Sequence, residues 1–280
     1  MSRSVAALLV THDSAGWIEP TLRSVLGQRH VPDAIVVVDD DSQDDTRAII
    51  ERVAGDRATI VRATSRHDDT ITRIAHNFHQ GIRACIAHEV VVLGDHDDIW
   101  HPARIGHQAN QLRTHRDIAM LAGDGRLVDA KGRPTGRTLR TAFPVPEAFN
   151  TMPGDEQMAY VLRHSVATGG ASAVRPAAFA DLAIPPGWLH DRWWSLVATA
   201  RGQLRIDDHQ VIDYRLSADQ QIGIDTALQQ RGPGVRLRHA LTNAPSVAAR
   251  IRDLRGLRAF AANDAIARAV STGGILAALR

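Results

Sequence analysis

The sequence is poor in residues on which several kinds of chemistry depend. Among its 280 residues, Cys85 is the only cysteine and Lys131 is the only lysine. A single cysteine excludes an intrachain disulfide framework and a thiolate zinc cluster, so we expect Cys85 to be a small buried residue. A single lysine argues against P-loop chemistry and Schiff-base catalysis, because both need a placed lysine.

Long apolar runs and a strong net charge are also absent. No run of apolar residues is long enough to cross a membrane, and the first one, Val5–Val10, is too short for a signal peptide. We therefore expect a cytoplasmic protein. The net charge is only +2, so nucleic acid is not an expected partner. Hydrophobic residues make up 44% of the chain, which is enough to fill a large core.

The first 115 residues alternate between apolar runs of strand length and amphipathic helical patterns. The predicted strands are Val5–Val10, Ala34–Val38, Thr59–Arg62 and Val90–Leu93. The predicted helices are Trp17–Leu26, Thr46–Val53 (with Ser42 as its N-cap), Ile71–His88 and Ala103–His115. This alternation predicts an α/β fold with a mostly parallel sheet flanked by helices.

The remaining sequence is less regular. It predicts a mixed apolar stretch at Ile118–Val128, a hairpin turn at Lys131–Gly136, helices at Glu156–Leu162 and Trp188–Ala200, and one or two strands at Leu204–Tyr214. From Thr226 the composition shifts to arginine and alanine with helical spacing. We therefore predict a catalytic domain over residues 1–225, with halves 1–115 and 116–225, and a helical C-terminal extension over residues 226–280.

Carboxylates follow three of the predicted strands. The strand Val90–Leu93 leads into Asp95, Asp97 and Asp98, and the first two strands lead into Asp13 and into Asp39–Asp41. Neighbouring carboxylates repel one another, so folding alone does not favour such a cluster. A bound Mg²⁺ or Mn²⁺ does, because one or two carboxylates and the phosphates of a substrate commonly hold these cations. The ends of strands in open α/β sheets are also where ligands bind. The simpler interpretation of each acidic segment is a solvated or helix-capping turn.

Taken in order, these motifs resemble the inverting family 2 glycosyltransferases with the GT-A fold, in particular the rhamnosyltransferase-like members. The likeness runs through about the first 225 residues. It rests on Thr11-His12-Asp13, Ser24–Gln28, Val36–Thr46, Arg73 with Asn77, Asp95–Trp100, and His190–Trp194 preceded by Gly169-Gly170-Ala171.

The resemblance implies a site for a UDP- or dTDP-linked sugar and a glycan or lipid-linked saccharide acceptor. The implied nucleotide-binding residues are Thr11, Asp13, Asp39, Asp40, Arg73 and Asp95. Asp97, with Asp95, is implied as the ligand of Mn²⁺ or Mg²⁺, and Asp191 as the general base. The implied acceptor or donor-sugar pocket contains Gly169, Gly170, His190, Trp193, Asp98 and Trp100.

The resemblance is incomplete near Tyr214-Arg215. The family often has a histidine a few residues further on, whereas this sequence has Ser217, Ala218 and Gln220. Two alternatives to an active transferase therefore stay open: a nucleotide-binding module or inactive partner subunit, and a sugar-1-phosphate nucleotidyltransferase. The second would need a glycine-rich basic loop after the first strand, which Thr11–Trp17 does not supply.

Several side chains have a structural alternative. Asp191 is also suited to capping the helix that follows it. His76 and His79 have metal-ligand spacing, but a half-exposed helix face is the favoured interpretation. Trp188, Trp193 and Trp194 are candidates for stacking on an acceptor sugar, and Trp193 and Trp194 are equally suited to the core. The arginines at the C-terminal end are candidates for contact with a second copy or with the inner face of a membrane, or for a solvated face: Arg250, Arg252, Arg255 and Arg258.

Overall fold

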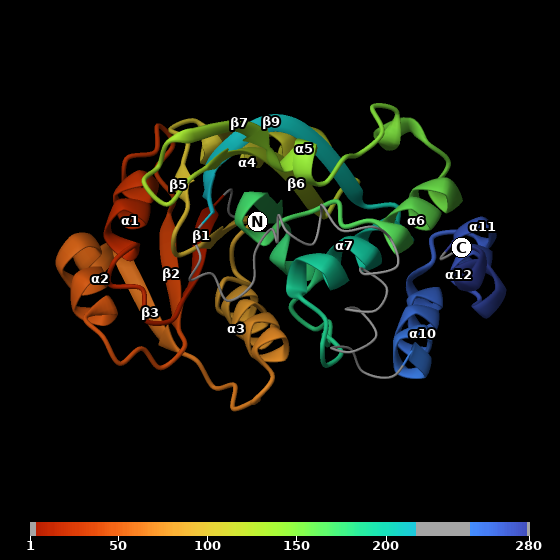
Figure 1. Ribbon diagram of the computed structural model, residues 1–280, viewed down its shortest axis with the longest axis horizontal. Coiled ribbons are helices and arrows are strands. Elements are labelled where there is room, and N and C mark those ends of the chain that lie inside the picture. Colours follow the sequence, from red (N-terminus) through yellow and green to blue (C-terminus); the bar gives the residue numbers. More distant parts are fainter. Residues whose placement is uncertain (1–3, 217–246, 279–280) are drawn as a thin grey trace.

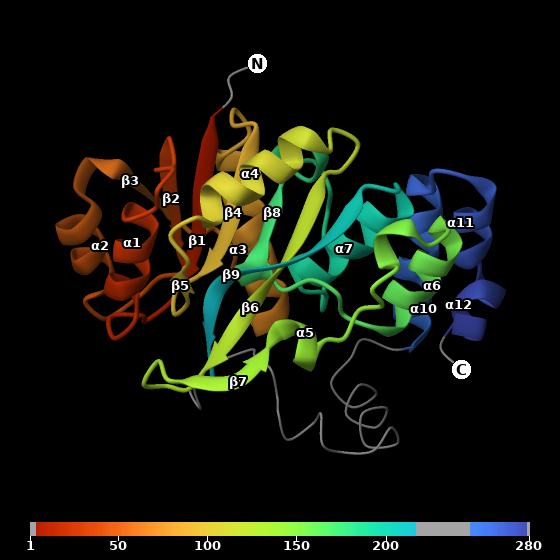
Figure 2. The ribbon, with the colours of Figure 1, turned by 90° about the horizontal axis from the view of Figure 1, so that it is seen from above.

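The computed structural model describes residues 4–216 and 247–278. Within these residues the strands form one nine-stranded sheet in the order β3-β2-β1-β4-β8-β6-β9-β5, with β7 paired to β6 (Figures 1 and 2). The strands are β1 (Val5–Thr11), β2 (Ala34–Asp39), β3 (Ala58–Arg62), β4 (Val90–Asp95), β5 (Ile99–Trp100), β6 (Met120–Val128), β7 (Pro134–Thr138), β8 (Ser172–Val174) and β9 (Leu204–Arg215). Strands β1 to β4 are parallel, as is the long β6–β9 pair, whereas the other pairs are antiparallel.

Helices cover both faces of the sheet. They are α1 (Ile18–Leu26), α2 (Thr46–Ala54), α3 (Thr70–Ala84), α4 (Arg104–Thr114), α5 (Leu139–Ala142), α6 (Gly154–Arg163), α7 (His190–Ala200), α10 (Val247–Gly256), α11 (Asp264–Ala269) and α12 (Thr272–Ala278). Every residue of β1 is buried, and alternate side chains enter two different apolar clusters. Ala6 and Leu8 pack with α3, α6 and α7, whereas Ala7 and Leu9 pack with α1 and α4. The twofold side-chain period of a strand thus produces a three-layer core.

The predicted α/β fold with a mostly parallel sheet flanked by helices is confirmed. The predicted hairpin turn at Lys131–Gly136 overlaps the connection between β6 and β7, residues 129–133, but Pro134 to Gly136 already belong to β7. Residues Leu204–Tyr214 form one long strand rather than two, because β9 pairs with β6 through two register shifts that let it continue.

Two predicted helix starts are corrected. Ser42 does not cap α2, since Asp45 occupies the N-cap position and the Ser42 hydroxyl accepts a hydrogen bond from the Asp13 amide at 3.0 Å. Helix α7 begins at His190 with Leu189 as N-cap, so Asp191 lies in the first turn and is not the cap.

The C-terminal helices α10, α11 and α12 lie at the end of the molecule opposite α1 and α2 (Figures 1 and 2). Their buried side chains, including Leu254, Leu257 and Ile266, belong to the same apolar cluster as those of α6 and α7. The predicted boundary at residue 226 and the position of Ser217 fall outside the described residues. In the part of the chain that is described, no helix has the length and apolarity needed to cross a membrane.

Candidate functional site

The predicted site residues gather where β1, β2 and β4 end. Thr11 is the register partner of Asp39, and Asp95 is the register partner of Val10. Because β1 lies between β2 and β4 and all three run in the same direction, their carboxyl ends meet at one edge of the sheet. The acidic segments that follow them are therefore neighbours in space, as the sequence indicated.

The edge formed by β1 and β2 contains two buried polar atoms with no partner. The Thr11 hydroxyl and the Asp39 Oδ1 have no hydrogen-bond partner among the described residues. Asp39 Oδ2 accepts from the Ser42 amide at 3.3 Å and lies 3.3 Å from Arg47 Nε. Buried polar atoms are normally satisfied, so this pair of atoms points to a polar ligand at the strand ends.

Asp40 and Arg73 lie beside this edge and form an ion pair with a distance of 2.8 Å between Asp40 Oδ2 and Arg73 Nε. Asp40 is almost fully buried, and Arg73 retains a quarter of its side-chain exposure. Helix α3, which begins after the Asp69 N-cap, positions Arg73 in its first turn.

Asp13 is exposed, and its hydrogen bonds connect the loop after β1 to the loop after β2. Its backbone is in the left-handed region, with φ of 44°, a conformation that aspartate adopts more readily than most residues. Its amide donates to the Ser42 hydroxyl, and its carboxylate accepts from the Gln43 amide at 2.7 Å. A role for Asp13 in nucleotide binding stays a prediction.

Three carboxylates, Asp95, Asp97 and Asp98, lie at the end of β4 and just after it, all with limited access to solvent. Burial, together with the charges of Asp97 and Asp191, raises the pKa of Asp95 to about 7. Burial and the charges of Asp97 and Asp95 raise the pKa of Asp98 well above its usual range. Asp98 Oδ1 accepts from the Arg215 amide at 3.1 Å, whereas its buried Oδ2 has no hydrogen-bond partner among the described residues.

Arg104 lies beneath these carboxylates, and the sequence analysis missed it. It is fully buried, its guanidinium lies 3.9 Å from the Trp100 ring centroid, and it donates to the Leu93 carbonyl at 2.6 Å. Burial lowers its pKa to about 9, and the charges of Asp98 and Asp95 oppose that shift. The only sequence signal was an arginine at the start of the helix after the acidic motif.

The short 3-10 helix η3 (Gly169–Ala171) connects the acidic strand end to helix α7. The Gly169 amide donates to Asp191 Oδ2 at 2.9 Å. A Cβ atom on Gly170 would lie 2.6 Å from Asp98 Oδ2 and 2.8 Å from Asp95 Oδ2. Only glycine permits this close approach, so the structure brings Asp191, Asp95 and Asp98 together around one turn.

The aromatic candidates are buried. His190 stacks on Phe78 with 3.6 Å between ring centroids, and burial lowers its pKa to about 4. Trp100 and Trp193 are 2% and 4% exposed and lie in the apolar clusters. Their predicted places in a sugar pocket stay predictions.

The carboxylates at the end of β4 suit a divalent cation whose remaining ligands come from the phosphates of a bound nucleotide. Among the described residues, no group of three or more histidine, cysteine or acidic side chains is arranged to hold a metal by itself. His76 packs against the His67 ring, and His79 donates to the Ala180 carbonyl. Magnesium sites of nucleotide enzymes use one or two carboxylates plus substrate phosphates. Asp95 and Asp97, whose charges act on each other, are two carboxylates that fit that description.

Comparisons with known proteins identify the family and the fold. The model for glycosyl transferase family 2 matches residues 7–179. A search of curated proteins finds no match. Among solved structures, Staphylococcus aureus TarS (residues 1–349) in complex with UDP-GlcNAc has a TM-score of 0.56 at 13% identity, over 99% of this chain and 90% of that chain. Glucosyl-3-phosphoglycerate synthase from Mycobacterium tuberculosis, with Mn²⁺, UDP and glucosyl-3-phosphoglycerate, has a TM-score of 0.53 at 17% identity, over 77% and 73%. At these identities the likeness establishes the fold, which is the GT-A fold that the resemblance implied.

Proposed function

Because the chain belongs to glycosyl transferase family 2, we propose that it transfers a sugar from a nucleoside diphosphate to a hydroxyl group, with inversion at the anomeric carbon. The observation that carries the proposal is the buried carboxylate group Asp95, Asp97 and Asp98, which meets Asp191 at the Gly169–Gly170 turn. This arrangement combines a site for a cation and diphosphate with a carboxylate placed to accept a proton.

The donor base is bound at the ends of β1 and β2. The unpartnered Thr11 hydroxyl and Asp39 Oδ1 are available to hydrogen-bond a base. The Asp40–Arg73 pair lies beside them and supplies both an acceptor and a cation. We expect UDP as the donor nucleotide, since the solved relatives TarS and glucosyl-3-phosphoglycerate synthase contain UDP or a UDP-sugar, and dTDP as the alternative.

Asp97 and Asp95 would hold Mg²⁺ or Mn²⁺ against the diphosphate. When bound, the cation neutralises negative charge on the departing nucleoside diphosphate. Asp98, hydrogen-bonded to the Arg215 amide, and Arg104 behind it keep the acidic loop in place.

Asp191 acts as the general base. It accepts the proton of the acceptor hydroxyl while that oxygen forms a bond to the anomeric carbon. The bond from the anomeric carbon to the phosphate oxygen breaks at the same time, and its electron pair leaves with the nucleoside diphosphate. The Gly169 amide, bound to Asp191 Oδ2, fixes the orientation of this carboxylate. A single displacement inverts the configuration without a covalent intermediate.

The sugar is a hexose or rhamnose in this proposal, since the Asp95–Trp100 motif resembles that of rhamnosyltransferase-like members and suits either a UDP-hexose or dTDP-rhamnose. Its acceptor is a glycan or lipid-linked saccharide.

The substitution Asp191→Asn tests the proposal. It keeps the size of the side chain and its contact with the Gly169 amide, but removes the base. We expect transfer to fall by about 10²–10⁴-fold, measured as nucleoside diphosphate release with a panel of UDP- and dTDP-sugars and saccharide acceptors. Binding of UDP should persist, since Asn still accepts the hydrogen bond from the Gly169 amide and the proposed nucleotide and cation ligands are unchanged. If the protein bound UDP without any turnover in the wild type, it would be a nucleotide-binding module instead.

A further inference from the structure

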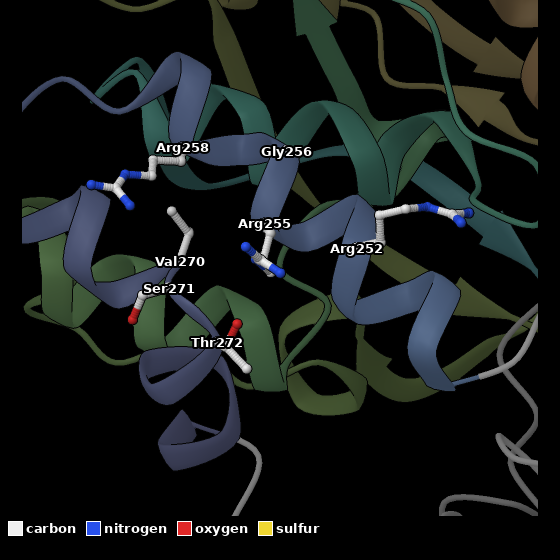
Figure 3. Close-up of a pocket in the computed structure, with 7 residues that line it drawn as sticks. All are labelled: Arg252, Arg255, Gly256, Arg258, Val270, Ser271 and Thr272. Carbon is white, nitrogen blue, oxygen red and sulfur yellow. The ribbon is translucent and has the colours of Figure 1, made fainter.

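The C-terminal helices line a partly open pocket of about 500 Å³, which is separate from the proposed donor site (Figure 3). Its lining comes from α10, the 3-10 helix η5 (Leu257–Phe260) and the junction of α11 with α12. The lining residues are Arg252, Arg255, Gly256, Arg258, Val270, Ser271 and Thr272. No acidic side chain is among them.

The arginines of this pocket are not used by the fold. Neither the Arg255 nor the Arg258 guanidinium has a hydrogen-bond or ion-pair partner in the described part of the chain, and both residues are exposed. Arg252 makes only a 3.9 Å contact with Asp253. By contrast, Arg250 on the same helix donates to the Gly187 carbonyl and lies over the Trp188 ring. The pocket therefore keeps positive charge that folding does not neutralise.

The pocket also contains two hydroxyl groups and a glycine with free space beside it. Figure 3 shows Arg255 between Arg258 and Arg252, with Ser271 and Thr272 on the facing segment. The Ser271 hydroxyl oxygen accepts from the Gly274 amide at 3.1 Å, so its hydrogen remains able to donate. A Cβ on Gly256 would meet nothing within 4 Å, so the wall of the pocket is open there.

We propose that this pocket binds a phosphate group. Guanidinium groups pair with phosphate through parallel hydrogen bonds and are the preferred cation for this purpose, and two hydroxyl groups add donors. The phosphate belongs either to a soluble phosphate ester or to the head group of an anionic lipid. The exposed Leu276, 45% accessible and one helical turn after Thr272, lies on the same face of α12 and suits contact with a lipid surface.

Binding of two probes to the full chain tests the proposal. Inorganic phosphate is titrated by calorimetry, and phosphatidylcholine vesicles with or without phosphatidylglycerol are tested by co-sedimentation. Calorimetric binding without vesicle binding identifies a soluble ester as the ligand, and binding that requires phosphatidylglycerol identifies a lipid. Absence of binding in both experiments overturns the proposal.

Substitutions test whether the measured binding of phosphate or vesicles takes place in this pocket. The double variant Arg255→Ala/Arg258→Ala should weaken binding by about tenfold or more, because hydrogen bonds to charged groups are stronger than neutral ones. Arg57→Ala/Arg83→Ala, two exposed arginines elsewhere, matches the loss of charge and should bind like the wild type. Gly256→Glu should weaken binding more than Gly256→Gln, since only Glu places a competing carboxylate beside the arginines. Binding that survives the Arg255/Arg258 substitutions, or falls equally in the charge-matched control, contradicts the proposal.

Discussion

Several charged residues of the site are buried. Asp98 and Arg104 are both 0% exposed, and Asp95 beside them is half-buried. Placing charges away from water costs free energy unless opposite charges or hydrogen bonds compensate. Arg104 compensates part of the negative charge, but burial, and after it repulsion between the carboxylates, still raises the pKa values of Asp95 and Asp98, so compensation by the described residues is incomplete. A bound cation would supply what is missing.

His190 gives the first prediction at this scale. Its folded-state pKa of about 4 lies below the ordinary 6.5, because the ring is buried against Phe78. Between these two values the unfolded chain binds more protons than the folded one, so stability is complete above pH 6.5 and is lost as the pH falls toward 4. We expect His190 to lower the free energy of unfolding by about 2 kcal/mol between pH 7 and pH 5.

Urea unfolding at both pH values measures this effect. The variant His190→Leu, similar in volume and unable to titrate, is the control, and its loss of stability between pH 7 and pH 5 should be smaller by the same amount. Equal losses in the two proteins would show that His190 is not neutral and buried as described.

At the scale of elements, the turn η3 controls the geometry of the site. The variant Gly170→Ala places a Cβ within 3 Å of carboxylate oxygens of both Asp98 and Asp95, so the two side chains must move. We expect UDP binding in the presence of Mn²⁺ to weaken by about tenfold and stability to fall by about 1–3 kcal/mol, the usual cost of overpacking. Calorimetric titration and urea unfolding measure the two effects.

Gly273→Ala in α12 is the matched control, because a Cβ there would meet nothing within 4 Å. It should bind UDP like the wild type and be at least as stable, since alanine favours a helix more than glycine does. Wild-type UDP affinity in Gly170→Ala would mean that the carboxylates at this turn do not form the donor site.

The first half of the fold could be predicted from the sequence because its elements carry local signals. Buried parallel strands such as β1 are continuous apolar runs, and the helices between them are amphipathic. The short strands β5 and β8, of two and three residues, carry no such signal, since only partners distant in the sequence define them. The acidic motifs could be placed at strand ends because they directly follow recognisable apolar runs. The burial of Arg104 beside them could not be predicted, because a helical pattern does not reveal which polar residue tertiary packing will bury.

At the scale of the whole molecule, the C-terminal helices support the catalytic half. Arg250 in α10 donates to the Gly187 carbonyl at 2.7 Å and lies over Trp188, and the Trp188 indole donates to Asp253 at 3.1 Å. These contacts hold the segment immediately before α7, which carries Asp191. The extension is therefore packed onto the segment that presents the general base.

The variant Arg250→Ala tests this support. We expect kcat to fall about tenfold through a misplaced Asp191, since small displacements of catalytic groups are costly, while the Kd for UDP stays unchanged. Arg268→Ala, an exposed arginine on the neighbouring helix α11, should keep wild-type kcat. A wild-type kcat in Arg250→Ala would show that the C-terminal helices do not orient Asp191.

The central claim is that the carboxylates after β4 form a metal-dependent site for a nucleoside diphosphate. A thermal-shift panel of UDP, dTDP, GDP, CDP and ADP, each with and without Mn²⁺, tests it most directly, because a ligand that binds the folded state raises the melting temperature. Our account predicts a shift with UDP or dTDP that requires Mn²⁺ and disappears in Asp97→Ala. No shift with any diphosphate, or the same shift in Asp97→Ala, would contradict it.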